Sequence, residues 1–216
     1  RPPTALAAAC VRLADHLERY GASVPLADVA HTLRVGRKAF AHRACVAAAD
    51  PAGAVAALRA TDSPWRAVGA PGARLPQCVF MFPGQGAQYA GMGRGLHAQD
   101  ALFRAALDEC LAAFEGVTDF DLREKLFSDD PEALAPTAVT QPATFAVEYA
   151  LARRALALSL QPAALVGHSV GEFAAAVIAG VMDLADAARL VARRGALMQA
   201  LPAGDMLSVR LPAVQS

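Results

Sequence analysis

The residues best suited to chemistry form one short segment, Gly167-His168-Ser169-Val170-Gly171. The apolar residues 164–166 before it are typical of the end of a buried strand, and the alanine-rich residues 172–178 after it are typical of a helix. Ser169 is therefore predicted to lie on a sharp strand-to-helix turn, where a nucleophile elbow places its serine. Such a turn leaves little room for side chains, which explains the glycines on both sides of it.

The segment supports two interpretations. In the first, the Ser169 hydroxyl is a nucleophile, and the Val170 backbone N–H, at the first turn of the helix, points at an oxyanion forming beside it. In the second, the segment is an ordinary tight turn of an α/β domain with an incidental serine. His168 adjoins the serine, but neighbouring side chains diverge at such a turn.

A second candidate loop follows the apolar segment 78–82. Glycines flank Gln85, so the backbone there can approach a ligand closely and supply further N–H groups to an oxyanion. A dinucleotide-binding loop is the alternative for this Gly-Gln-Gly pattern. That fingerprint requires a third glycine three residues later, where this chain has Tyr89.

Arg194 is the candidate group for binding a carboxylate. A helix is predicted from Asp183, which caps it, to about Leu201, and Arg194 is expected on its inward face. That face is defined by the larger apolar residues, Leu190, Val191, Leu197, Met198 and Leu201. A guanidinium buried there requires a carboxylate from the protein or from a substrate, so a structural ion pair and a ligand-binding role both remain open.

The elements around these residues are predicted to follow the order of a parallel α/β fold. An apolar strand of the kind covered on both faces is expected at 78–82. Three helices are expected after it, at 102–114, 119–127 and 143–158, the last of them preceded by Thr140-Gln141-Pro142. The strand that carries Ser169 at its end comes next.

The first third of the chain is predicted to be a separate small α/β domain. Its expected elements are a strand within 42–49 and helices at 4–20, 25–33 and 51–58. Residues 61–77 are rich in proline, glycine and alanine, which is typical of a linker, and Trp65 within them is expected to pack against a neighbour. With a boundary near Leu75, the predicted domains are 1–74 and 75–216.

Composition argues against several classes of function. The chain has 20 basic and 20 acidic residues and no basic stripe, so neither nucleic acid nor a membrane is an expected partner. Its four cysteines form no C-x-x-C pair, which predicts reduced thiols in a cytoplasmic protein and no metal site. The chain has no initiator Met, and both of its ends are expected to be cut from something longer.

Several segments together resemble the acyltransferase domain of modular polyketide synthases, a family related to malonyl-CoA:acyl-carrier-protein transacylase. They are Phe82-Pro-Gly-Gln-Gly-Ala-Gln88, Thr140-Gln-Pro-Ala143, Gly167-His-Ser-Val-Gly-Glu172 and Arg194-Gly-Ala-Leu-Met-Gln199. The resemblance runs from about Leu75 to Pro212. Upstream, segments at 13–17, 28–30 and 35–40 resemble the linker domain that joins a ketosynthase to the acyltransferase.

The resemblance implies an ester mechanism. Ser169 would take an acyl group from coenzyme A, and the backbone amides of Gln85 and Val170 would form the oxyanion hole. Val170, directly after the serine, is similar to the malonyl-selecting members of the family, whereas methylmalonyl-selecting members tend to have glutamine there.

The resemblance also implies the substrates and partners. Arg194 would hold the free carboxylate of a malonyl-type unit, with Gln141 and His168 in the substrate site. Acyl-CoA would be the donor and the phosphopantetheine thiol of an acyl carrier protein the acceptor, beside the ketosynthase of the same synthase. No bound cofactor is expected.

In one respect the sequence departs from the family. A catalytic histidine is expected well downstream of the serine, yet no residue after Ser169 is a histidine. The resemblance implies a small α/β linker domain followed by an α/β-hydrolase-like parallel-sheet core. Because the histidine is absent, only part of that core is expected here. The ferredoxin-like subdomain would be mostly missing, with its first strand beginning at Met206.

Two rival functions remain. One is a serine acyl-hydrolase or editing enzyme on the same elbow, although such an enzyme gains nothing from a buried Arg194. The other is a docking or scaffolding piece that is inactive alone, which the absent histidine favours.

Overall fold

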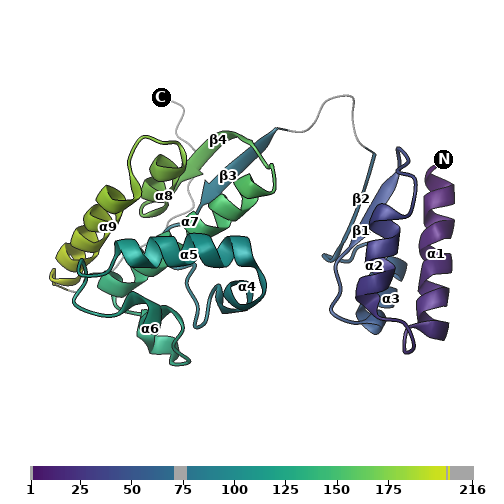
Figure 1. Ribbon diagram of the computed structural model, residues 1–216, viewed down its shortest axis with the longest axis horizontal. Helices are drawn as coiled ribbons and strands as arrows, with labels where there is room; N and C mark the ends of the chain where they lie inside the picture. The colour runs from purple at the N-terminus through teal and green to yellow at the C-terminus, as the bar shows by residue number, and fades with distance from the viewer. Residues whose placement is uncertain (1, 71–76, 203, 205–216) are drawn as a thin grey trace. The chain divides into compact units, whose positions relative to one another are not determined.

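The computed structural model describes residues 2–70, 77–202 and 204. The chain divides into two compact units, Arg1–Pro76 and Gln77–Ser216, and each is considered by itself (Figure 1). The boundary predicted at Leu75 and the strand predicted from Met206 lie outside the described residues.

Over its described residues, 2–70, the first unit has three helices and a two-stranded antiparallel sheet. Its elements are α1 (Pro3–Tyr20), α2 (Leu26–Val35), β1 (Arg43–Val46), α3 (Pro51–Arg59) and β2 (Arg66–Gly69). The core forms where Cys10, Ala14 and Leu17 of α1 pack with Ala54 and Leu58 of α3. Asp50 caps α3 by accepting a hydrogen bond from the Gly53 N–H at 2.7 Å.

Two predictions for this unit are wrong. Strand β2 lies inside the segment predicted as linker, and it pairs with β1 so that Arg43 lies opposite Gly69. Pairing with a distant strand, not local composition, makes these four residues extended. Trp65 is 67% exposed instead of packed, although its backbone carbonyl accepts a hydrogen bond from the Ala47 N–H at 2.9 Å.

The second unit combines a parallel strand pair with helices. Its elements are β3 (Cys78–Phe82), α4 (Arg94–Gln99), α5 (Ala101–Ala113), α6 (Leu122–Leu126), the 3-10 helix η1 (Pro131–Leu134), α7 (Thr137–Ala157), β4 (Pro162–Gly167), α8 (Gly171–Ile178) and α9 (Leu184–Gln199). Strands β3 and β4 are parallel, with Phe82 opposite Gly167. The parallel pair confirms the predicted α/β class.

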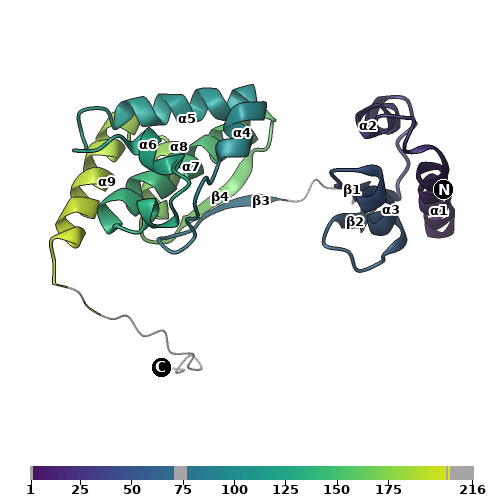
Figure 2. The same ribbon diagram turned by 90° about the horizontal axis from the view of Figure 1, so that it is seen from below.

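Helix α7 is the centre of the second unit. Most of its side chains are buried, and α5 and α9 both pack along it. Phe145 of α7 meets Phe114 edge to face, with ring centroids 6.0 Å apart. Figures 1 and 2 show strands β3 and β4 side by side along one margin of the unit, with helices α4 to α7 gathered beyond them.

The structure corrects two expectations for the second unit. Helix α7 begins at Thr137, six residues earlier than predicted, and Pro142 lies inside it. A proline in the second turn removes only one backbone hydrogen bond, which the buried surroundings of this helix outweigh. Strand β3 is not covered on both faces, because Met81 is 76% exposed and Val79 is 47% exposed.

Candidate active site

The structure places Ser169 on the predicted turn, between the end of β4 and the start of α8 (Figure 1). Its backbone has φ 55°, in the left-handed region that a non-glycine residue rarely adopts. Two backbone hydrogen bonds hold the turn. The His168 N–H donates to the Phe82 carbonyl at 2.9 Å, and the Gly171 N–H donates to the His168 carbonyl at 3.0 Å.

Steric crowding explains both glycines of the segment. A Cβ atom on Gly167 would lie 2.4 Å from the backbone nitrogen of Glu172, and one on Gly171 would lie 2.4 Å from the Phe82 carbonyl oxygen. Backbone atoms cannot move aside as a flexible side chain can. The turn therefore requires glycine at both positions, and it brings Ser169 to the surface with its side chain exposed.

The loop after β3 lies against this turn. A Cβ atom on Gly84 would lie 2.5 Å from His168 Nδ1, so the two segments touch there. Val170 is fully buried at the N-terminus of α8, and Gln85 follows Gly84 on the loop. Within the described part of the chain, the backbone N–H groups of Val170 and Gln85 have no acceptor. Both are free to bind an anion.

Arg194 reaches the serine from α9. Its Nη2 donates a hydrogen bond to Ser169 Oγ at 3.0 Å, and its Nη1 donates one to Gln141 Oε1. Gln141 is only 1% exposed, and its own amide nitrogen lies 3.2 Å from Met198 Sδ. The guanidinium carbon also lies 5.9 Å from the centre of the Phe173 ring. These contacts fix the guanidinium beside the hydroxyl.

The partners of Arg194 are electrically neutral. Among the described residues no carboxylate forms an ion pair with it, and both of its hydrogen-bond acceptors are uncharged oxygens. A half-buried guanidinium with neutral partners keeps its full charge available for an anionic ligand. The arrangement can therefore hold a carboxylate close to the serine oxygen.

The inward face of α9 differs from the predicted one. Leu190, Leu197, Met198 and Leu201 are 43%, 52%, 43% and 67% exposed, and of the predicted set only Val191 is buried. The buried face is made instead of small residues, Ala187, Ala188, Ala192 and Gly195, with Val191. A Cβ atom on Gly195 would lie 3.2 Å from Ala138 Cα, so small side chains allow α9 to approach α7 closely.

In the described part of the chain, Ser169 Oγ donates no hydrogen bond to a proton acceptor. His168 is exposed, and its ring packs against Gly84. His97 lies on α4, where its Nε2 pairs with Asp108 Oδ1 at 2.9 Å. Over residues 2–70, 77–202 and 204, no histidine is hydrogen-bonded to Ser169 Oγ.

Sequence reasoning missed two features of this region. Phe173 lies under the Arg194 guanidinium, and its position four residues after Ser169, one helical turn on, was the available signal. The other is Glu148 on α7, which is only 7% exposed and has no hydrogen-bond partner among the described residues. Burial raises the pKa of the Glu148 carboxyl to about 8.

The remaining structural findings concern metals, thiols and membranes. Within the described ranges, no cluster of three or more histidine, cysteine, aspartate or glutamate side chains could hold a metal ion. All four cysteines are free thiols. No described helix is both long and apolar enough to cross a membrane.

Family comparisons match both parts of the chain. Residues 79–216 match the acyl transferase domain family, and residues 1–58 match the family described as CurL-like, PKS C-terminal. Phenolphthiocerol synthesis polyketide synthase type I Pks15/1 of Mycobacterium marinum is 42% identical over 215 residues, which is 96% of this chain and 10% of that protein. Mycoketide-CoA synthase of Mycobacterium tuberculosis is 40% identical over 94% of this chain and 5% of its own length.

Solved structures show the same fold. The acyl transferase domain of ZmaA is 36% identical with a TM-score of 0.80, and the match covers 94% of this chain and 48% of that one. The acyltransferase domain from the second module of the salinomycin polyketide synthase is 46% identical with a TM-score of 0.65, again over 94% and 48%. The chain thus spans about half of these solved domains and a tenth or less of the two synthases. With the match over residues 79–216, the chain belongs to the acyltransferase domain family.

Proposed function

We propose that this chain is part of an acyltransferase that moves a malonyl-type unit from coenzyme A to an acyl carrier protein in polyketide biosynthesis. The observation that carries the proposal is the 3.0 Å hydrogen bond from Arg194 to Ser169 Oγ, made by a guanidinium whose partners among the described residues are all neutral. A nucleophile next to an unpaired cation suits an acyl group that ends in a free carboxylate.

In the first half-reaction, Ser169 Oγ attacks the thioester carbonyl carbon of acyl-CoA. The carbonyl oxygen becomes an oxyanion, which the free N–H groups of Val170 and Gln85 stabilise. The intermediate then collapses, the carbon–sulfur bond breaks, and coenzyme A leaves as its thiol with the proton that the serine gave up. The acyl group remains as an ester on Ser169.

In the second half-reaction, the phosphopantetheine thiol of the carrier protein attacks this ester. The carbon–oxygen bond breaks, Ser169 regains a proton, and the acyl group leaves as a carrier-bound thioester. A base must take the serine proton first and return it later. We infer that a histidine outside these 216 residues supplies it, because the described part of the chain brings none to Ser169.

Arg194 and Gln141 together provide the selectivity. Arg194 Nη2 can exchange Ser169 Oγ for the substrate carboxylate as its acceptor, while Gln141, buried and held near Met198, keeps Nη1 in place. A neutral amide positions the cation without neutralising it. His168, which packs against the Gly84 loop, is proposed to shape the substrate site and not to act as the base.

The proposal extends to the first unit and to the partners. The first unit, whose residues 1–58 match a family of polyketide synthase segments, is proposed to be the linker domain between a ketosynthase and the acyltransferase, with 1–74 and 75–216 as the two domains. The free thiols agree with a reducing compartment such as the cytoplasm.

One observation favours a second candidate function. Because no described histidine is hydrogen-bonded to Ser169 Oγ, the chain alone could be a docking or scaffolding piece without turnover. A serine hydrolase for simple acyl groups has no comparable support, since it has no use for the cation at Arg194.

The intact mass of the protein after incubation with malonyl-CoA tests the proposal. We expect a malonyl adduct to form slowly on the wild-type chain, because the inferred base lies outside it, and no adduct to form on Ser169→Ala. Acetyl-CoA serves as the comparison, and it should label the serine far more slowly. Equal labelling by both donors would contradict selectivity for a carboxylate, and no labelling by either would favour the scaffold.

A further inference from the structure

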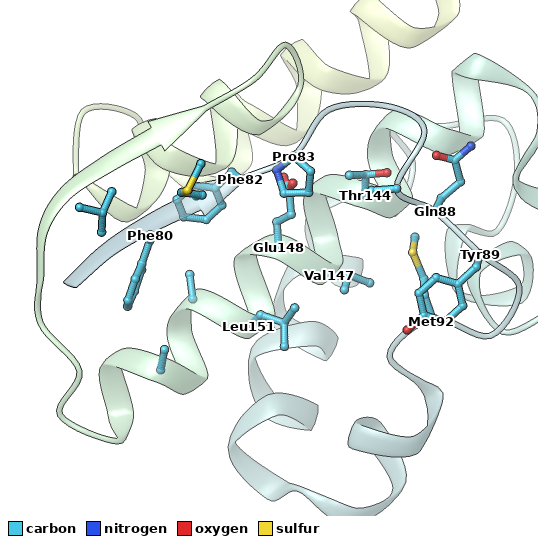
Figure 3. A pocket seen from close by; sticks show the side chains of 15 residues that line it. Phe80, Phe82, Pro83, Gln88, Tyr89, Met92, Thr144, Val147, Glu148 and Leu151 are labelled. Carbon is cyan, nitrogen blue, oxygen red and sulfur yellow. The ribbon is translucent and has the colours of Figure 1, made fainter. Parts of the chain in front are cut away.

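The loop that follows β3 contains Gln85, whose backbone N–H has no acceptor among the described residues. Residues 84–88 lie outside the helices and strands, and within the described part of the chain they form no backbone–backbone hydrogen bond. Figure 3 shows the loop arching from Pro83, at the end of β3, to Gln88, and both of these residues line a pocket of about 440 Å³ beside β3 and α7. The backbone around Gln85 therefore needs other contacts to keep a single conformation.

Two side chains supply such contacts. Gln88 Oε1 accepts a hydrogen bond from the Gly86 N–H at 2.7 Å, two residues back in the same loop. Gln85 Nε2 donates a hydrogen bond to Thr137 Oγ1, at the start of α7, at 3.1 Å. Gln88 is half-buried whereas Gln85 is exposed, so water competes more strongly for the contact with Thr137 than for the contact made by Gln88.

The contact made by Gln88 constrains the backbone next to Gln85. Gly86 has φ 114°, in a region that glycine adopts readily and other residues do not, although a Cβ atom there would meet nothing within 4 Å. Glycine is therefore needed at this position for its conformation and not for space. The Gly86 N–H belongs to the peptide group that follows Gln85. A hydrogen bond that holds this peptide group also limits the directions in which the Gln85 N–H can point.

The direction of the Gln85 N–H matters if it stabilises an oxyanion. A donor of an oxyanion hole must lie about 2.7–3.1 Å from the oxyanion, and a misplacement of about 1 Å can slow a reaction on the order of 100-fold. The other donor, the Val170 N–H, is well fixed, because Val170 is fully buried at the start of α8. The loop is thus the less constrained half of the hole.

We propose that Gln88 is a positioning residue for the oxyanion hole. Its side-chain oxygen holds the Gly86 N–H, and the loop then keeps the Gln85 N–H directed at the oxyanion that forms during acyl transfer. Gln88 acts through Gln85 and does not touch the reacting atoms. This inference rests on the proposed function, because that function assigns the Gln85 N–H to an oxyanion.

The test removes the acceptor and follows both the loop and the reaction. Gln88→Leu keeps a side chain of similar size, and Gln88→Ala is a second variant with the same loss. The NMR order parameter of the Gln85 N–H should fall from about 0.85, typical of a rigid backbone, to below about 0.6. The saturating rate of malonyl loading of Ser169 should fall about tenfold or more, with an unchanged half-saturating concentration of malonyl-CoA, because Arg194 is intact.

Two further variants are the controls. Gln88→Glu keeps an acceptor for the Gly86 N–H, so it should preserve the order parameter and most of the loading rate. Gln161→Leu, at an exposed glutamine outside the loop, should change neither.

If the wild-type chain is loaded, a Gln88→Leu variant in which either readout is unchanged overturns the proposal. Loss of order in Thr137→Val instead would mean that Thr137 holds the loop. A wild-type chain that takes up no malonyl group contradicts the proposed function, and the order parameter then decides the role of Gln88. A Gln85 N–H that is as rigid in Gln88→Leu as in the wild type overturns that role, and a mobile one supports it.

Discussion

Arg194 donates a hydrogen bond to Ser169 Oγ across 3.0 Å, although 25 residues separate them in the chain. The serine oxygen thus accepts from a cation, which leaves the hydroxyl proton free to point toward a base. Under the proposed function, the same cation would bind the carboxylate at the far end of a short acyl group. The proposed nucleophile and the proposed specificity group are thus in direct contact.

Replacing Arg194 with alanine should slow the loading of Ser169 with a malonyl group but not with an acetyl group. Loss of a charged hydrogen-bond donor costs about 1.5–3 kcal/mol, so malonyl loading of Ser169 should slow by about 10- to 100-fold. Acetyl loading needs no cation and should change little. The rates of adduct formation from both donors, measured by intact mass, check this. Arg193→Ala, on the exposed side of α9, is the control and should leave both rates unchanged.

Replacing Gln141 with glutamate should remove malonyl selectivity without removing the guanidinium. The new carboxylate has the shape of the amide and lies in hydrogen-bond contact with Arg194, so an ion pair would form and repel the substrate carboxylate. We expect malonyl loading to fall about as far as in Arg194→Ala, with the melting temperature preserved. The exposed Gln161→Glu is the charge-matched control. A variant that still prefers malonyl would refute the role given to Gln141.

The turn and the loop could be predicted from the sequence because their requirements are local. Gly167 and Gly171 are demanded by backbone atoms of the same turn or of the adjacent strand end, and a strand-turn-helix pattern is enough to place them. Helical spacing predicts the inward position of Arg194, but the large apolar residues predicted beside it are mostly exposed. The buried face of α9 consists of small residues because α7 comes close, and that distance is a tertiary property.

Glu148 shows what the sequence could not reveal. A glutamate in an alanine-rich helix is normally exposed to solvent. Nothing in the position of Glu148 in the sequence distinguishes it from an exposed glutamate. Glu148 is buried in the folded unit, where it lines a pocket together with residues of β3. Strand β2 was missed for a related reason, since its pairing with β1 joins segments that lie far apart in the chain.

Replacing Gly171 with alanine should destabilise the second unit. The added methyl would lie 2.4 Å from the Phe82 carbonyl oxygen, and relieving such a contact costs about 1–3 kcal/mol. Urea denaturation should show this loss in the free energy of unfolding, together with slower loading of Ser169. Gly95→Ala on α4 is the control, because a Cβ there meets nothing within 4 Å and alanine favours a helix. Equal stability of the two variants would show that the turn relaxes freely.

Glu148 should make the stability of the second unit depend on pH. Burial raises its pKa from 4.5 to about 8, so between these values the folded state holds a proton that the unfolded state has lost. The contribution of the Glu148 carboxyl to the free energy of unfolding therefore falls as the pH rises from about 4.5 to about 8. It stays constant above that window.

Glu148→Gln removes this titration while keeping a neutral side chain of the same shape. The variant should match the wild type near pH 4.5 and exceed its stability by an amount on the order of 4 kcal/mol at pH 8. Urea denaturation across this range measures the difference, and Glu172→Gln, at an exposed glutamate, corrects for the loss of one charge. A difference that does not grow with pH would mean that the carboxyl is already ionised in the folded chain, and hence that water or a cation reaches the pocket.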